Sequence, residues 1–253
     1  MARIVALLLF VAVLITLIFS HAPIYQDEAY HLFADRRAFL GIPNFCDVVS
    51  NFGFLWGGLL GLTLLKKHPF PKEFRLPIGI FFAGVAWVAF GSAYYHWAPD
   101  AKRLVWDRLP MSVAFSALLA AVIADHISAR AGYLLTLPFV LLGVASVLQW
   151  HLGNEAGRGD LRFYFLVQFG TLLIVPGILL LYPFPKGQNC NASTLSAFGL
   201  YVLAKVFEYF DRAIFNFGGI LSGHTLKHLS AALGCYFLYR VVWLRLDSTR
   251  SPL

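Results

Sequence analysis

Charged residues are scarce in this chain. Of its 253 residues, 13% are charged and 59% are hydrophobic, whereas a soluble domain is usually about one-quarter charged. This composition excludes an ordinary soluble domain and predicts a polytopic membrane protein. The formal net charge of +7 comes from basic residues in short loops between apolar runs. That distribution favours orientation in a bilayer over binding to nucleic acid.

Cysteine is also scarce, and its pattern excludes two kinds of site. Cys46, Cys190 and Cys235 lie far apart and form no CxxC pair. A disulfide framework or a thiolate metal site is therefore not expected. The chain shows no internal repeat or low-complexity segment, and its short loops offer no signalling module. The bilayer and a lipid are the expected partners, and no protein partner is evident.

Apolar runs of membrane-spanning length fill most of the sequence. A helix needs about 20 residues to cross the hydrocarbon core. Eight such runs occur, at residues 3–20, 48–65, 76–97, 108–128, 132–151, 162–182, 195–215 and 221–244. They predict an all-α, polytopic transmembrane helical bundle, with a seven-helix core and one extra N-terminal span.

The first run has two interpretations. Arg3 precedes it and Ser20-His21-Ala22 follow it, as in a signal peptide. Its length and the weak cleavage site favour an uncleaved anchor. The predicted organisation is therefore an anchor or signal-like segment at 1–22, an external polar segment at 23–47, and a seven-helix domain at 48–253.

Orientation follows from the basic residues of the short loops. One side carries Arg3, Lys66, Lys67, Lys72, Arg75, Arg130, Lys186, Arg245 and Arg250. The other side carries Arg36, Arg37, Lys102, Arg103, Arg158 and Arg162, which several acidic residues offset. This bias predicts that both termini lie in the cytoplasm.

Five polar residues are predicted to gather on the opposite, non-cytoplasmic side. Ser92 and His96 are four residues apart at the end of the third span, so they share a helix face. Asp107 opens the fourth span. His224 and His228 are four apart at the start of the eighth. The number of crossings between these spans brings all five groups to the same side of the membrane.

These residue types suit a catalytic zinc site. HxxxH on a helix points two imidazoles at a common point. His96 would be the third ligand and would leave the fourth position for water, whose pKa zinc lowers to about 7. Asp107 is then placed to take a proton from that water. Ser92 is placed to donate a hydrogen bond to the oxyanion formed when a carbonyl is attacked.

Simpler interpretations apply to each residue alone. A single Ser or His in a span often bonds a backbone carbonyl or a neighbouring helix. HxxxH by itself is also a weak signal. The combination of HxxxH, SxxxH and an aspartate on one side is stronger, because ionisable groups at membrane depth are usually functional.

The complete motif set resembles the alkaline ceramidases, within a superfamily that also includes the adiponectin-receptor-like proteins. The set is SxxxH, an aspartate eleven residues after that histidine, and a late HxxxH. The resemblance covers about residues 44–244, including "NFCDVVSNFGF". It implies a seven-helix bundle that holds zinc through His96, His224 and His228, beside Ser92 and Asp107. Polar residues on the same side are possible supporting groups, namely Asp47, Ser50 and Asn51.

This chain departs from the family pattern in its N-terminal segment. The animal alkaline ceramidases carry an acidic, Trp-containing segment there that binds calcium. This chain has Asp27, Glu28 and Asp35 in that region, without a clear match to the ligand pattern. The sequence therefore does not favour a calcium site.

The resemblance implies a zinc-dependent amidase that cleaves the N-acyl bond of ceramide-like lipids to a fatty acid and a long-chain base. Another N-acyl lipid remains open as the substrate. One alternative is an adiponectin-receptor-like receptor. Another is a metal-ion or proton transporter, which should show polar residues through the whole bilayer. An intramembrane serine protease would use Ser92 as its nucleophile and leave three histidines without a role.

Overall fold

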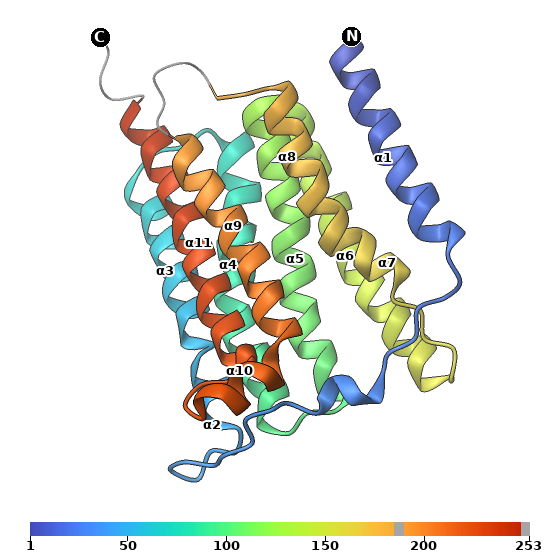
Figure 1. Ribbon diagram of the computed structural model, residues 1–253. Coiled ribbons are helices and arrows are strands. Elements are labelled where there is room, and N and C mark those ends of the chain that lie inside the picture. Colours follow the sequence, from blue (N-terminus) through green and yellow to red (C-terminus); the bar gives the residue numbers. More distant parts are fainter. Residues whose placement is uncertain (185–189, 249–253) are drawn as a thin grey trace. The chain divides into compact units, whose positions relative to one another are not determined.

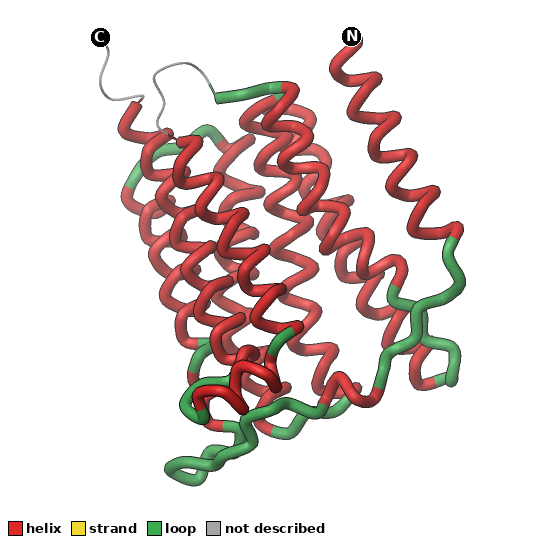
Figure 2. Tube along the Cα trace, viewed as in Figure 1, coloured by secondary structure: helices red, strands yellow, loops and turns green. Residues whose placement is uncertain are grey.

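The computed structural model describes residues 1–184 and 190–248 as helices joined by loops. Figure 1 gives the order of the elements along the chain, and Figure 2 shows how helix dominates over loop. The described part contains one isolated β-bridge, between Phe39 and Ile42. Lys186 and Arg250, which contribute to the predicted cytoplasmic side, lie outside these residues.

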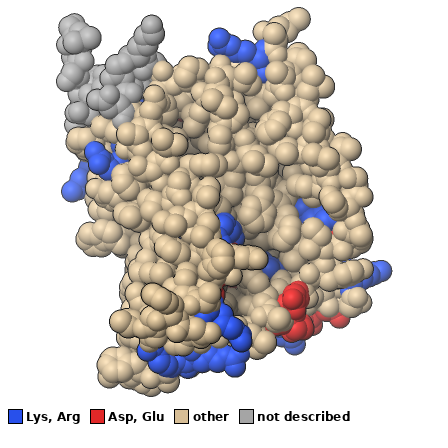
Figure 3. Space-filling model, viewed as in Figure 1, with Lys and Arg blue, Asp and Glu red and all other residues tan. Residues whose placement is uncertain are grey.

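Eight helical segments within the described residues are long and apolar enough to cross a membrane. They are α1 (Ala2–Ser20), Phe45–Lys67, α4 (Lys72–Trp97), α5 (Ala101–His126), α6 (Ala129–Glu155), Arg162–Leu181, α9 (Cys190–Tyr209) and Gly223–Leu246 of α11 (Gly223–Ser248). Much of the face visible in Figure 3 carries neither acidic nor basic side chains. The protein is an integral, multi-pass membrane protein, and the predicted all-α polytopic fold is confirmed.

Two spans contain interruptions. The second consists of α2 (Phe45–Val49) and α3 (Phe52–Lys67). The sixth consists of α7 (Arg162–Phe165), a π-helical turn (Leu166–Gly170) and α8 (Thr171–Leu181).

The seventh span ends earlier than the apolar run predicts. The run reaches residue 215, but α9 ends at Tyr209 and a separate helix, α10 (Asp211–Gly218), follows. Phe210, between them, has φ −94° and ψ 19°, which interrupts the helical path. A hydropathy window misses this break because α10 is itself partly apolar.

The chain forms two compact units, and α4 and α5 contribute residues to both. The first unit contains Met1–Glu28, Pro69–Gly84 and Arg108–Pro183. Within it, α5 and α6 approach closely: a Cβ added at Gly132 would lie 2.4 Å from the backbone nitrogen of Ala124. Small residues allow this kind of close helix packing in a membrane.

The second unit contains Ala29–His68, Val85–Asp107 and Phe184–Leu253. Here α11 packs against α9 and α3, as Figure 1 shows. The contact with α3 is close, since a Cβ added at Gly53 would lie 2.8 Å from the Cβ of Ala232. Every predicted site residue except Asp27 and Glu28 belongs to this unit.

Candidate metal centre

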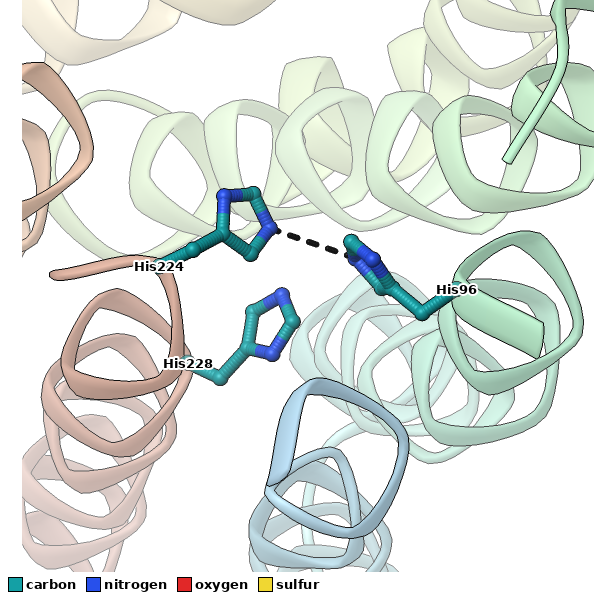
Figure 4. Close-up of side chains that lie close together, drawn as sticks. All are labelled: His96, His224 and His228. Atoms are coloured by element: carbon teal, nitrogen blue, oxygen red, sulfur yellow. Dashed lines mark hydrogen bonds between the residues drawn. The ribbon is translucent and has the colours of Figure 1, made fainter. Parts of the chain in front are cut away.

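Two helices of the second unit carry the three histidines. His96 lies in the last turn of α4, and His224 and His228 lie in the first two turns of α11. The i, i+4 spacing on α11 places the latter two imidazoles on one face. Figure 4 shows all three rings directed toward a common point.

The start of α11 is fixed by hydrogen bonds and by a glycine. The Ser222 hydroxyl accepts a bond from the backbone N–H of Thr225 at 3.0 Å, as an N-cap residue does. The Asp211 carboxylate on α10 accepts a bond from the backbone N–H of His224 at 2.8 Å. A Cβ at Gly223 would lie 2.2 Å from the Phe207 carbonyl oxygen, so only glycine fits there. These contacts fix the position of His224 at the start of α11.

The imidazoles are close enough to share a metal ion. One potential ligand atom from each histidine lies within 4.8 Å of the others, and all three residues are buried. The Nε2 atoms of His96 and His224 are 3.2 Å apart. Three neutral imidazoles suit zinc, copper, nickel or iron. The cluster could therefore hold a metal ion, whose identity this ligand set alone does not specify.

Ser50 orients one of these ligands. Its hydroxyl lies 2.8 Å from Nδ1 of His228 and donates to the Asp47 carbonyl at 3.1 Å. In the tautomer that leaves the Nε2 lone pair free for a metal, Nδ1 of His228 donates to the Ser50 hydroxyl, and the hydroxyl donates to the Asp47 carbonyl. Such an outer hydrogen bond is how proteins fix the tautomer of a metal-binding histidine.

Asp47 and Asn51 support the same region. The Asp47 carboxylate is fully buried and accepts hydrogen bonds from Thr225 at 2.6 Å and from Ser222 at 3.3 Å. The Asn51 side-chain amide donates to the Asp47 carbonyl at 2.7 Å. Asp47 and Ser50 thus join α2 to the start of α11, and Asn51 bonds back to α2. The His228 ring contacts the Ser50 hydroxyl and also the Asp47 backbone.

Ser92 and Asp107 are both buried in this unit. Ser92 is one turn before His96 on α4, on the same helix face. Asp107 lies in the second turn of α5, which begins at Ala101, earlier than the apolar pattern predicts. Its charge interacts with that of Lys227 on α11. The roles assigned to Ser92 and Asp107 from the sequence stay predictions.

The polar segment before α2 covers the histidines, which the sequence did not predict. The Phe33 ring lies 4.7 Å from the His96 ring and 4.3 Å from the His224 ring, centroid to centroid. The backbone N–H of Ala34 donates to the Asp211 carboxylate at 2.9 Å. Arg37 donates to the carbonyls of Gly219 and Ile220 at 3.0 and 2.6 Å. We call residues 31–37 the cover.

Of the three candidate calcium ligands, Asp35 is paired with an arginine. Both carboxylate oxygens of Asp35 accept hydrogen bonds from Arg37 at 2.8 Å, which holds the pKa of that carboxyl below its usual range. Asp27 and Glu28 are exposed and belong to the first unit. Among the described residues, the three histidines are the one group of three or more His, Cys, Asp or Glu side chains arranged to hold a metal.

Three further charged residues lie beside the histidines. Lys227 Nζ is 3.3 Å from Nε2 of His224 and 2.8 Å from the Glu208 carboxylate. Lys205 bonds the other oxygen of Glu208 at 2.6 Å. The sequence contained a signal for them, because Lys205 and Glu208 interrupt a predicted span and charged residues inside spans are usually functional.

No family model and no curated protein sequence matches this chain. The resemblance to the alkaline ceramidases therefore rests on the motifs alone. Chemically, the second unit offers three metal-ligating nitrogens, a buried hydroxyl and a buried carboxylate, next to apolar helices that span the membrane. This combination is suited to metal-assisted hydrolysis of a lipid.

Proposed function

We propose that the protein is a zinc-dependent intramembrane amidase of the alkaline ceramidase type. It would cleave the N-acyl bond of ceramide-like lipids to a fatty acid and a long-chain base. The observation that carries the proposal is the convergence of three buried imidazoles from α4 and α11 on one point.

The donor set fits zinc. Three protein ligands that leave a fourth position open are typical of catalytic zinc, whereas structural sites close all four positions. Zinc bound there would polarise a carbonyl group and lower the pKa of a water molecule to about 7. The contact between Nδ1 of His228 and Ser50 supports this use, because a hydrogen bond donated by Nδ1 leaves the Nε2 lone pair available for zinc.

Asp107, Ser92 and Phe33 each have a role in the proposed hydrolysis. The oxygen of water bonds to the amide carbon, the carbon–nitrogen bond breaks, and a proton from the water leaves with the amine. Asp107 accepts that proton and passes it to the leaving nitrogen. Ser92 donates a hydrogen bond to the carbonyl oxygen as its negative charge develops. Phe33 limits bulk water at the histidines.

The position of the site within the spans fits a ceramide. His96 and His224 are each one residue from the end of a membrane-spanning helix. The amide of a ceramide lies at a similar depth, at the boundary between headgroups and acyl chains. Apolar helices would enclose the two chains, and the loop basic residues favour a site that opens to the non-cytoplasmic side.

Metal analysis combined with a substrate panel tests this function. Protein purified in detergent should contain about one zinc per chain and release fatty acid from ceramides or related N-acyl lipids. The double variant His224→Ala/His228→Ala should lose both the metal and the hydrolysis. His21→Ala is the matched control, because this exposed histidine follows α1 in the other unit.

Two results would overturn the proposal. One is full zinc content in the double variant, which would remove the histidines as ligands. The other is a metal-loaded wild-type protein that hydrolyses none of the N-acyl lipids. Trapping of an acyl-serine adduct at Ser92 would replace this mechanism with a serine nucleophile.

A further inference from the structure

Lys227 places a positive charge at the histidine cluster. It lies one residue before His228 on α11, and its Nζ is 3.3 Å from Nε2 of His224. Its side chain is only 16% exposed, in a helix that spans the membrane. A largely buried ammonium is costly in such a place, so its presence there points to a functional role.

Glu208 holds this ammonium in position. One carboxylate oxygen of Glu208 bonds Lys227 at 2.8 Å, and the other bonds Lys205 at 2.6 Å. The single negative charge of Glu208 therefore pairs with two ammonium groups. Lys205, Glu208 and Lys227 together carry a net charge of one positive unit. Asp107 also attracts Lys227.

Metal binding would remove one partner of Lys227. The ammonium now faces Nε2 of His224, which can accept a hydrogen bond through its lone pair. A metal ion held by that nitrogen would use the same lone pair. The N–H of Lys227 would then need another acceptor next to a second positive charge, and an anionic oxygen satisfies both requirements.

We propose that Lys227, positioned by Glu208, forms a carboxylate-binding subsite of the metal centre. Its ligand is the headgroup of a long-chain fatty acid. The inference rests on the proposed function for this ligand, because hydrolysis of an N-acyl lipid leaves a long-chain carboxylate at the site. Lys205 bonds the far oxygen of Glu208 and lies outside the subsite.

Binding of dodecanoate to the full-length, zinc-loaded protein in an uncharged detergent tests the subsite. Isothermal titration should show that Lys227→Gln weakens dodecanoate binding by about 10- to 100-fold, the loss expected for one charge-assisted hydrogen bond. Lys205→Gln is the matched control, because it also removes one ammonium group that bonds the Glu208 carboxylate. The affinity of this variant for dodecanoate should stay within about threefold of wild type. Dodecan-1-ol should bind all three proteins equally.

Three results would overturn the inference. They are wild-type affinity in Lys227→Gln, an equal loss in Lys205→Gln, or a parallel loss of dodecan-1-ol binding. If Lys227→Gln does not fold, zinc-free wild-type protein decides by its preference for dodecanoate over dodecanamide, because bound zinc would itself favour the carboxylate. A preference of about tenfold or more supports the subsite and equal binding refutes it.

The same preparations separate this inference from the proposed function. Protein that binds dodecanoate through Lys227 but hydrolyses no N-acyl lipid would retain the subsite and overturn the amidase. Hydrolysis without Lys227-dependent carboxylate binding would overturn the subsite alone.

Discussion

Replacing Ser50 by alanine should weaken metal binding at the three histidines while the protein stays folded. When Nε2 of His228 binds a metal, its Nδ1–H donates to the Ser50 hydroxyl, 2.8 Å away, which in turn donates to the Asp47 carbonyl. Without this hydroxyl, the His228 ring loses one of the two partners that fix its orientation and tautomer and keeps only the Asp47 backbone. The ring must then be ordered when the metal binds, which costs affinity.

The size of the effect follows from these contacts. Loss of an outer hydrogen bond to a ligating histidine usually lowers metal affinity by about 10- to 100-fold, equivalent to about 1.4–2.7 kcal/mol. The effect on folding should be smaller, about 1 kcal/mol. One reason is that the Asp47 carbonyl keeps its hydrogen bond from Asn51 at 2.7 Å.

Competition with a chromogenic zinc chelator measures this affinity. Ser230→Ala is the control, because Ser230 is a buried serine on α11 two residues after His228. A dissociation constant for Ser50→Ala within about twofold of the control would refute the reasoning. It would show that His228 is held in place by packing alone.

Ser92→Ala should keep the metal but lower turnover by about 100-fold, as for loss of an oxyanion donor; an unchanged rate would make Ser92 a packing residue. Cysteines introduced at Ala101 and Lys67 should react with an impermeant thiol reagent from opposite sides, and labelling of Lys67→Cys from outside intact cells would invert the topology. Gly223→Ala should destabilise the protein by about 1–3 kcal/mol, because the new Cβ meets the Phe207 carbonyl at 2.2 Å. Thermal unfolding against Gly199→Ala, where no atom lies within 4 Å of the added Cβ, measures this difference.

The spans and the meeting of the histidines could be predicted because both depend on simple periodicities. A run of about 20 apolar residues is needed to cross the bilayer, whatever the neighbouring helices are. The pair His224 and His228 shares a face through its spacing on one helix, and the number of crossings brings it to the same side as His96. The end of the seventh span was less predictable. The break at Phe210 depends on local backbone angles rather than on hydropathy.

The surroundings of the histidines could not be derived in this way. Phe33 lies in a loop, where no periodicity relates a residue to its contacts, and its position depends on bonds from Ala34 and Arg37 to distant residues. Lys227 lies between two histidines in sequence, but Glu208 on a different helix determines where its ammonium lies. Such contacts depend on tertiary packing.

Asp211 connects the cover to the helix that carries His224. One carboxylate oxygen accepts the backbone N–H of His224, and the other accepts that of Ala34 in the cover. If the cover moved away to admit a lipid, the bond to Ala34 would break, and Asp211 would become freer to leave His224. A metal ion bound by the histidines would then be held most firmly with the cover closed. Each opening for substrate would also be an interval for exchange of the ion with the medium.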